Sequence, residues 1–223
     1  MLIVNPSYSE VSEKMLHPSY WSGRAEPVSV GGRGGAWFVD ANQGQMVLRM
    51  YRRGGVAARL SESRYLFTGW HRTRSYREFQ VLSKLYEIGL PVPEPVAASA
   101  CQSGLFYQAA ILIRRIPDAV PLPEVCELDK DAIWWKVGRT IRRFHEAGLD
   151  HVDLNCDNIL VANGRVHVID FDRCIIRKPG VEKRWAKRNL ARLYRSIEKR
   201  VNTVDITKSW QSLLAGYRKV AQS

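Results

Sequence analysis

The sequence has few cysteines, and they are not arranged as a metal or disulfide framework. The four cysteines lie far apart, with no C-x-x-C pair and no accompanying histidine cluster at zinc-ligand spacing. This excludes a zinc-binding module and a small disulfide-stabilised domain. We expect a reduced, cytoplasmic chain.

Long apolar runs are also missing. No stretch reaches the roughly 18 apolar residues of a membrane-spanning helix, and the N-terminal MLIVNPSYSEVSEK has neither the charged region nor the apolar run of a signal peptide. Internal repeats and low-complexity tracts are absent as well. If the protein meets a membrane, we expect it to do so from the surface.

Acidic residues are scarce relative to basic ones. The chain has 223 residues, of which 34 are Lys or Arg and 22 are Asp or Glu, so its net charge is +12. Its apolar content of 45% is enough for one large domain or two small lobes. The charge predicts an anionic partner, which is a phosphate, a nucleic acid or an acidic membrane surface.

The excess positive charge falls in two blocks. Residues 51–77 contain seven Arg and one Glu, and residues 177–200 contain ten Lys or Arg and two Glu. Taken alone, each block could also be an ordinary solvated face of the protein with no binding role.

The N-terminal half has the pattern of an antiparallel sheet with one helix. Strands are predicted at 28–30, 35–40, 45–51 and 105–113, with an extended connector at 91–99. A helical stripe of apolar residues over 75–88 ends at Gly89. Residues 1–28 show no periodicity and predict an irregular lead-in.

The C-terminal half is predicted to be mainly helical. Three prolines place a boundary near 116–123, which divides the chain into lobes 1–116 and 117–223. One amphipathic helix follows Asp129, its expected N-cap, and stops at Gly148. Two more helices are predicted at about 182–200 and 207–221.

The stretch HVDLNCDNILVANGRVHVIDFD, residues 151–172, combines a hairpin signal with several acids. Asn163 and Gly164 suit a two-residue type I′ turn, which places Asn158 opposite Ile169 and next to Asp170. Asp153 precedes Asn158 on the same loop. Three oxygen donors therefore converge, and such a set suits Mg²⁺ with substrate phosphates.

These residues resemble the active site of protein-kinase-like phosphotransferases. HVDLNCDN resembles the H-x-D-x-x-x-x-N catalytic loop, and DFD at 170–172 resembles the Asp-Phe-Gly segment. The resemblance implies that Asp153 orients and deprotonates an attacking hydroxyl. It also implies that Asn158 and Asp170 hold Mg²⁺ on ATP.

Elements of the same resemblance lie upstream. Glu78 matches the helix glutamate of the family, and Arg49 stands where its phosphate-binding lysine is expected. Arginine keeps the charge but differs from lysine in shape, so this is a departure from the pattern. A glycine cluster resembles the phosphate-binding loop and consists of Gly31, Gly32, Gly34 and Gly35.

Two further departures point away from protein kinases. Asp172 replaces the glycine of Asp-Phe-Gly, and no activation segment or Ala-Pro-Glu anchor follows it. A substrate other than a protein is implied. The chain resembles most the lipopolysaccharide kinase family, through LRMYRRGG, RYLFTGWHRTRSYREF, LPVPEPVAA, IRRFHEAGLDHVDLNCDNIL and VIDFDRC to NLARLYRS, over roughly residues 30–200.

Within that family the resemblance is to members acting on 3-deoxy-D-manno-octulosonic acid (Kdo). It implies an α+β, two-lobe protein-kinase-like fold and ATP-dependent phosphorylation of the 4-hydroxyl of Kdo on a lipid A precursor. The protein would act peripherally at the cytoplasmic face of a Gram-negative inner membrane. We expect no nucleic acid and infer no protein partner.

The basic blocks fit this acceptor. Kdo carries a carboxylate and lipid A carries phosphates, which arginines interleaved with aromatic residues can bind. The expected acceptor-binding residues are Arg59, Arg64, Arg72 and Arg74. The second block is expected either to lie on an anionic leaflet or to pack on its own lobe.

Two alternatives stay open from the sequence. One is another kinase of the same build, which phosphorylates a lipopolysaccharide heptose or a small molecule such as an aminoglycoside. The other is a non-catalytic kinase-like module that binds anionic lipid, which Arg49 in place of lysine favours and the carboxylate cluster disfavours.

Overall fold

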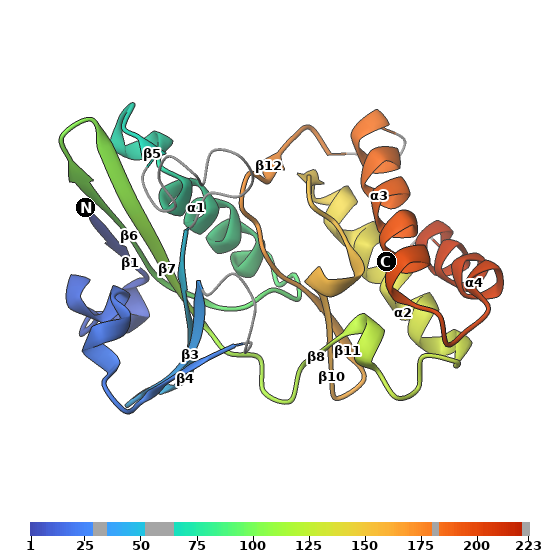
Figure 1. Cartoon of the computed structure of the whole chain (residues 1–223). Helices are drawn as coiled ribbons and strands as arrows, with labels where there is room; N and C mark the ends of the chain where they lie inside the picture. The colour runs from blue at the N-terminus through green and yellow to red at the C-terminus, as the bar shows by residue number, and fades with distance from the viewer. Residues whose placement is uncertain (29–34, 52–64, 180–182, 220–223) are drawn as a thin grey trace. The chain divides into compact units, whose positions relative to one another are not determined.

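The structure is a computed structural model that describes residues 1–28, 35–51, 65–179 and 183–219 (Figure 1). Its contacts divide the chain into two compact units. The first unit is Met1–Lys84 with Pro93–Arg115, and the second is Leu85–Val92 with Ile116–Ser223. Several predicted site residues lie outside the described ranges: Gly31, Gly32, Gly34, Arg59 and Arg64.

The first unit is an antiparallel sheet with one long helix, as predicted. Its strands are β1 Leu2–Val4, β2 Ala25–Pro27, β3 Ala36–Ala41, β4 Gly44–Met50, β5 Tyr65–Leu66, β6 Pro95–Ser103 and β7 Phe106–Arg114. They pair in the order β1-β6-β7-β4-β3-β2, with β5 on β7. Helix α1, Arg74–Glu87, agrees with its predicted range within one residue and lies beside β6 and β7 (Figure 1).

The described strand β2 ends at Pro27, and most of the strand expected at 28–30 lies outside the described residues. One other strand prediction in this unit was wrong. The segment 91–99 was read as a connector, yet β6 begins at Pro95. Residues 95–100 are buried on both faces, so their sequence shows no alternation.

The lead-in is part of the core of the first unit. Short 3₁₀ turns at Pro6–Tyr8, Glu13–Leu16 and Pro18–Trp21 carry apolar side chains under the sheet. Trp21 is 1% exposed and donates from Nε1 to the Met15 carbonyl at 2.7 Å. The turns thus cover the sheet face that β4 and β6 would otherwise expose.

The second unit holds three helices and short strands. Its helices are α2 Asp131–Glu146, α3 Arg184–Arg200 and α4 Ile206–Arg218, and its strands are β8 Val120–Pro121, β9 Leu149–Asp150, β10 Ile159–Ala162, β11 Arg165–Val168 and β12 Ile175–Ile176. The strands form the sheets β11-β10-β8 and β12-β9. The described helix bounds agree with the prediction, apart from the last residues of α4.

The predicted N-cap of α2 was wrong. Lys130 holds the cap position, and Asp129 lies in a turn that Lys130 closes by donating its amide to the Glu127 carbonyl at 3.0 Å. Asp131 then supplies the acidic residue of the first helical turn, where it interacts favourably with the helix dipole.

Helices α2 and α4 pack with their backbones in close contact, and they lie side by side in Figure 1. A Cβ atom added at Gly138 would lie 1.9 Å from the Leu213 carbonyl oxygen. One added at Gly216 would lie 2.0 Å from the Trp135 carbonyl oxygen. Only glycine fits these two positions. Within the described residues, no helix combines the length and hydropathy needed to cross a bilayer.

Candidate active site

The β10–β11 hairpin has the register predicted from its turn. Ile159 pairs with Val168, and the Asn158 carbonyl accepts the Ile169 amide at 3.0 Å. The turn residues Asn163 and Gly164 have φ angles of 48° and 70°, as a type I′ turn requires. The predicted register, with Asn158 opposite Ile169 and so next in line to Asp170, is confirmed.

The loop between β9 and β10 presents Asp153 at the surface. The Asn158 side chain donates from Nδ2 to the Asp153 carbonyl at 3.0 Å, and the Asn158 amide donates to Asn155 Oδ1 at 3.0 Å. These bonds hold the loop backbone and occupy the donor end of the Asn158 amide group. Its carbonyl oxygen is the end that suits a cation, and the Asp153 side chain is 45% exposed.

Asp170 has a backbone conformation that its neighbours hold in place. Its φ is +63°, a left-handed value that non-glycine residues seldom adopt. The preceding carbonyl, of Ile169, lies 3.0 Å from Nε2 of His151, which donates to it in the neutral tautomer. Burial lowers the pKa of His151, which keeps the ring neutral. The histidine of the loop therefore fixes the residue next to Asp170.

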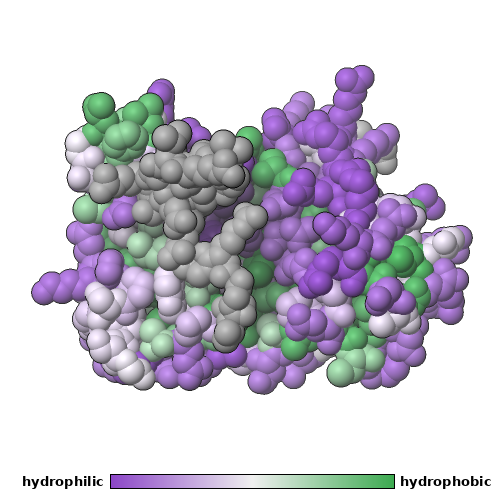
Figure 2. Space-filling view, viewed as in Figure 1, coloured by the Kyte–Doolittle hydropathy of each residue, from purple (hydrophilic) through white to green (hydrophobic). Residues whose placement is uncertain are grey.

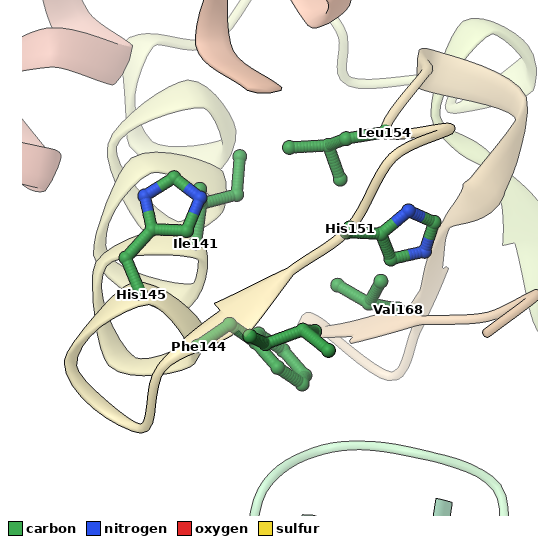
Figure 3. A pocket seen from close by; sticks show the side chains of 7 residues that line it. Ile141, Phe144, His145, His151, Leu154 and Val168 are labelled. Atoms are coloured by element: carbon green, nitrogen blue, oxygen red, sulfur yellow. The ribbon is translucent and has the colours of Figure 1, made fainter. Parts of the chain in front are cut away.

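The buried side of this loop is tightly packed. Phe144, His145, His151, Leu154 and Val168 line a cavity of about 10 Å³ (Figure 3), which is room for one water at most. His145 Nδ1 lies 2.7 Å from the Tyr217 hydroxyl, and burial lowers its pKa to about 4. Both histidines thus support the loop from its core side.

A buried polar network joins this loop to α3. Asp150 is 1% exposed. Its carboxylate accepts hydrogen bonds from Asn189 Nδ2 at 3.1 Å and from Arg177 Nε at 2.6 Å. Asn189 in turn accepts the His151 amide at 3.1 Å through Oδ1. We had no sequence signal for this network, because its members are separated by up to 39 residues.

Two loop acids pair with arginines of α3. Arg192 donates to Asp153 from both Nε, at 2.9 Å, and Nη2. Arg200 Nη2 donates to Asp157 Oδ1 at 3.0 Å. Sequence reasoning missed both pairs, although the basic face of α3 was visible as a charge block. The Asp153 carboxylate is therefore paired with the guanidinium group of Arg192.

In the first unit the predicted pair Arg49 and Glu78 is formed. Nη2 of Arg49 lies within hydrogen-bond distance of both Glu78 carboxylate oxygens, and the carboxylate is nearly buried. Tyr51, which was not predicted, also donates its hydroxyl to Glu78. Burial first, and the Glu78 charge second, raise the pKa of Tyr51 well above its usual value. Arg49 and Tyr51 share a face of the chain at i, i+2, a signal that could have found the tyrosine.

The other described site residues lie near these elements. Gly35 precedes β3 and accepts the Met50 amide at 2.7 Å. Arg74 donates from Nη1 to the Tyr65 hydroxyl at 2.6 Å and lies 4.9 Å from that ring centroid. Arg72 is exposed on the 3₁₀ turn Trp70–Arg72.

Asn158 and Asp170 fit a magnesium ion. Among the described residues, no three His, Cys, Asp or Glu side chains form a metal-binding group. Mg²⁺ needs only one or two carboxylates when phosphates and waters complete its shell. An amide oxygen and a carboxylate at one point of the hairpin meet that smaller requirement.

A protein-family model matches most of this chain. Residues 19–217 match the model of the Lipopolysaccharide kinase (Kdo/WaaP) family. The chain belongs to this family. It is therefore a kinase, and the relationship inferred from the sequence motifs is confirmed. Family membership also favours a phosphotransferase over the non-catalytic module.

Relatives within the Kdo/WaaP family cover most of the chain. A protein of Xanthomonas campestris pv. campestris (strain B100), named 3-deoxy-D-manno-octulosonic acid kinase, is 48% identical over 208 residues, 91% of this chain and 83% of the relative. A protein of Xylella fastidiosa (strain M12) with the same name is 48% identical over 192 residues, 85% of this chain and 76% of the relative.

Solved structures show the fold. WaaP in complex with acyl carrier protein matches with a TM-score of 0.61 and 18% identity, over 99% of this chain and 90% of that one. The Rio2 kinase-ADP/Mg²⁺-phosphoaspartate complex from Chaetomium thermophilum matches with a TM-score of 0.53 and 20% identity, over 91% and 66%. The predicted α+β, protein-kinase-like fold is confirmed.

Proposed function

We propose that this kinase transfers the γ-phosphoryl group of ATP to the 4-hydroxyl of a Kdo residue on a lipid A precursor. The hairpin register, which puts Asp170 next to the residue opposite Asn158, and the bond from Asn158 Nδ2 to the Asp153 carbonyl support the proposal. The names of the relatives, which share nearly half of the sequence, support Kdo as the acceptor sugar.

Asp153 is the proposed catalytic residue. It orients the acceptor hydroxyl and accepts its proton while the hydroxyl oxygen bonds to the γ-phosphorus and the bond to the leaving ADP oxygen breaks. Its exposure and its place on a loop held by Asn158 and Asn155 support this role. The transferring phosphoryl group needs positioning more than covalent help.

Asn158 and Asp170 are the proposed ligands of Mg²⁺ on the nucleotide. The ion would neutralise charge on the β- and γ-phosphates. His151 holds the Ile169 carbonyl and so fixes the backbone from which Asp170 extends. This bond supports a metal ligand whose backbone is already held in place before the nucleotide binds.

The proposed nucleotide contacts of the N-terminal lobe, residues 1–116, are Gly32, Gly34, Gly35, Arg49 and Glu78. Glu78 and Tyr51 hold the Arg49 guanidinium in one place, as the lysine–glutamate pair of protein kinases holds its lysine. The C-terminal lobe, residues 117–223, is the proposed catalytic lobe. Proposed acceptor contacts from the first basic block are Arg59, Arg64, Arg72 and Arg74.

The proposed location is the cytoplasmic face of the inner membrane, where the protein would bind peripherally. The net charge of +12 and the lipid-linked acceptor support it. Cosedimentation with vesicles containing anionic lipid, but not with neutral vesicles, is the expected result. Equal cosedimentation with both would contradict an electrostatic attachment.

The acceptor assay tests the function. The purified chain is incubated with Mg²⁺, γ-labelled ATP and either a Kdo-bearing lipid A precursor or a heptose-bearing acceptor whose Kdo is already phosphorylated. We expect label only on the first acceptor, at C4 of Kdo by NMR of the product. Label only on the heptose would replace Kdo by heptose as the acceptor.

A further inference from the structure

A hollow in the second unit is lined in part by Arg192, the residue that pairs with Asp153. Its volume is about 240 Å³, and its wall also includes Asp150, Val152, Arg188 and Arg195. Small-molecule pockets usually measure ~300–1,000 Å³. This hollow is therefore of a size to take one part of a ligand, next to the proposed catalytic residue.

The three arginines come from one side of α3. They stand at i, i+4 and i+7, so they project from the same side of the helix. The side that faces the lobe carries buried residues such as Trp185, Leu193 and Ile197. In the view of Figure 2 the α3 region is mostly hydrophilic. The helical spacing of these three arginines is therefore enough to bring their guanidinium groups to the same hollow.

The positive charge of this wall exceeds the negative charge beside it. Arg188 Nη2 lies 3.7 Å from Asp150 Oδ2, but Arg177 Nε already meets that oxygen at 2.6 Å. Arg195 takes part in none of the ion pairs found between described residues. Arg192 is paired with Asp153 alone, and both side chains are about half exposed.

We propose that this hollow binds the carboxylate of the acceptor sugar, with Arg188, Arg192 and Arg195 as its donors. The proposal rests on the proposed function and names the part of the acceptor that the site recognises. Arginine forks match carboxylates in geometry and charge. A carboxylate on the phosphorylated sugar itself lies within one ring of the reacting hydroxyl, whereas lipid phosphates lie further along the acceptor. Arg192 both lines the hollow and contacts Asp153, so the anion bound there belongs to the sugar that is phosphorylated.

Arg192 connects binding to catalysis. Its guanidinium group forms an ion pair with Asp153. An ion pair this exposed contributes little to the stability of the protein. A bound carboxylate offers Arg192 a second acceptor and leaves Asp153 to the sugar hydroxyl. Val152, 38% exposed at the same wall, provides an apolar contact for the ring.

The test compares acceptors and variants. Wild-type protein, Arg188→Ala and Arg195→Ala are assayed with the Kdo-bearing acceptor and with its C1 carboxamide. Lys199→Ala is the matched control, because it removes one charge from exposed α3 outside the hollow. We expect each arginine variant to raise the acceptor KM by about 5- to 50-fold with little change in kcat or in the KM for ATP. Arg195→Lys should recover part of the loss.

The carboxamide arm distinguishes the proposal from nonspecific charge. Wild type and Lys199→Ala should prefer the carboxylate, and Arg188→Ala and Arg195→Ala should lose most of that preference. Unchanged preference in both arginine variants would overturn the assignment. The assay is repeated with a Kdo acceptor that lacks the lipid phosphates. If the arginine variants are impaired only on acceptors that carry those phosphates, the hollow binds phosphate and the assignment to the carboxylate is overturned. A wild-type protein inactive on every Kdo acceptor would refute the proposed function itself.

Discussion

Arg192 donates from Nε to Oδ1 of Asp153 across 2.9 Å, and so links the proposed base to a helix 39 residues further along the chain. The neighbouring acid Asp157 is paired with Arg200 of the same helix at 3.0 Å. Both carboxylates are 45% exposed. Both pairs join an equally exposed carboxylate of this segment to an arginine of α3, so Asp157 can serve as a control for Asp153.

Asp153→Ala should lower kcat by ~10² to 10⁴, the usual range for loss of a general base. ATP binding, measured by calorimetry, should change little because Asp153 is not a proposed ligand of the nucleotide. Asp157→Ala removes an equally exposed, equally paired acid from the same loop and should retain kcat within about threefold. Equal losses in the two variants would remove Asp153 from its role.

Tyr51→Phe should lower the free energy of unfolding by about 1.5–3 kcal/mol, the usual contribution of a hydrogen bond to a charged partner. The tyrosine is buried, and its hydroxyl donates to the nearly buried Glu78 carboxylate. Urea denaturation measures the change. Tyr194→Phe is the control, since Glu198 raises the pKa of its exposed hydroxyl but water can replace that contact. A Tyr194 effect as large as that of Tyr51 would contradict the account.

Gly138→Ala should destabilise the fold by ~3 kcal/mol or more. Helix propensity favours alanine by about 1 kcal/mol, but the new methyl group would lie 1.9 Å from the Leu213 carbonyl and push α2 from α4. Thr140→Ala, two residues on in the same helix and half-exposed, gains propensity without the clash and should be neutral or mildly stabilising. A neutral Gly138 variant would show that the helices separate easily.

Acid should destabilise the protein through His145. The folded pKa of about 4 lies below the ordinary 6.5 because the ring is buried, so the unfolded chain binds the proton more tightly. The stability from this group is complete above pH 6.5 and is lost as pH falls toward 4, by about 3 kcal/mol in all.

Unfolding free energies of wild type and His145→Gln between pH 7.5 and 4 measure this loss. The difference between the two proteins should shrink as pH falls. His71→Gln, at an exposed histidine, should leave the slope as in wild type. A pH-independent difference at His145 would show that only packing is lost.

Local patterns were enough to predict much of the fold and part of the site. The Asn163–Gly164 turn fixes the hairpin register, and that register alone brings Asn158 to Asp170. The amphipathic stripes of α1 and α2 likewise follow from spacing, and the pair of Arg49 with Glu78 follows once the family pattern is recognised.

The misses have separate physical causes. The Asp153–Arg192 pair and the Asp150–Asn189 bond join residues 39 apart, so these partners are set by how α3 packs on the loop and not by local spacing. The close contact of α2 and α4 at Gly138 and Gly216 likewise shows in no local periodicity. β6 was missed at its start because burial on both faces removes the alternation that marks a strand.

The hairpin register also limits how the length of this segment can change during evolution. A residue inserted or deleted within β11 would move every later side chain to the opposite face, and Asp170 would then leave Asn158. An insertion at the Asn163–Gly164 tip changes only the loop and keeps the strand pairs. We therefore expect homologous sequences to vary in length at the tip of this hairpin, while the two strands below it keep a constant number of residues.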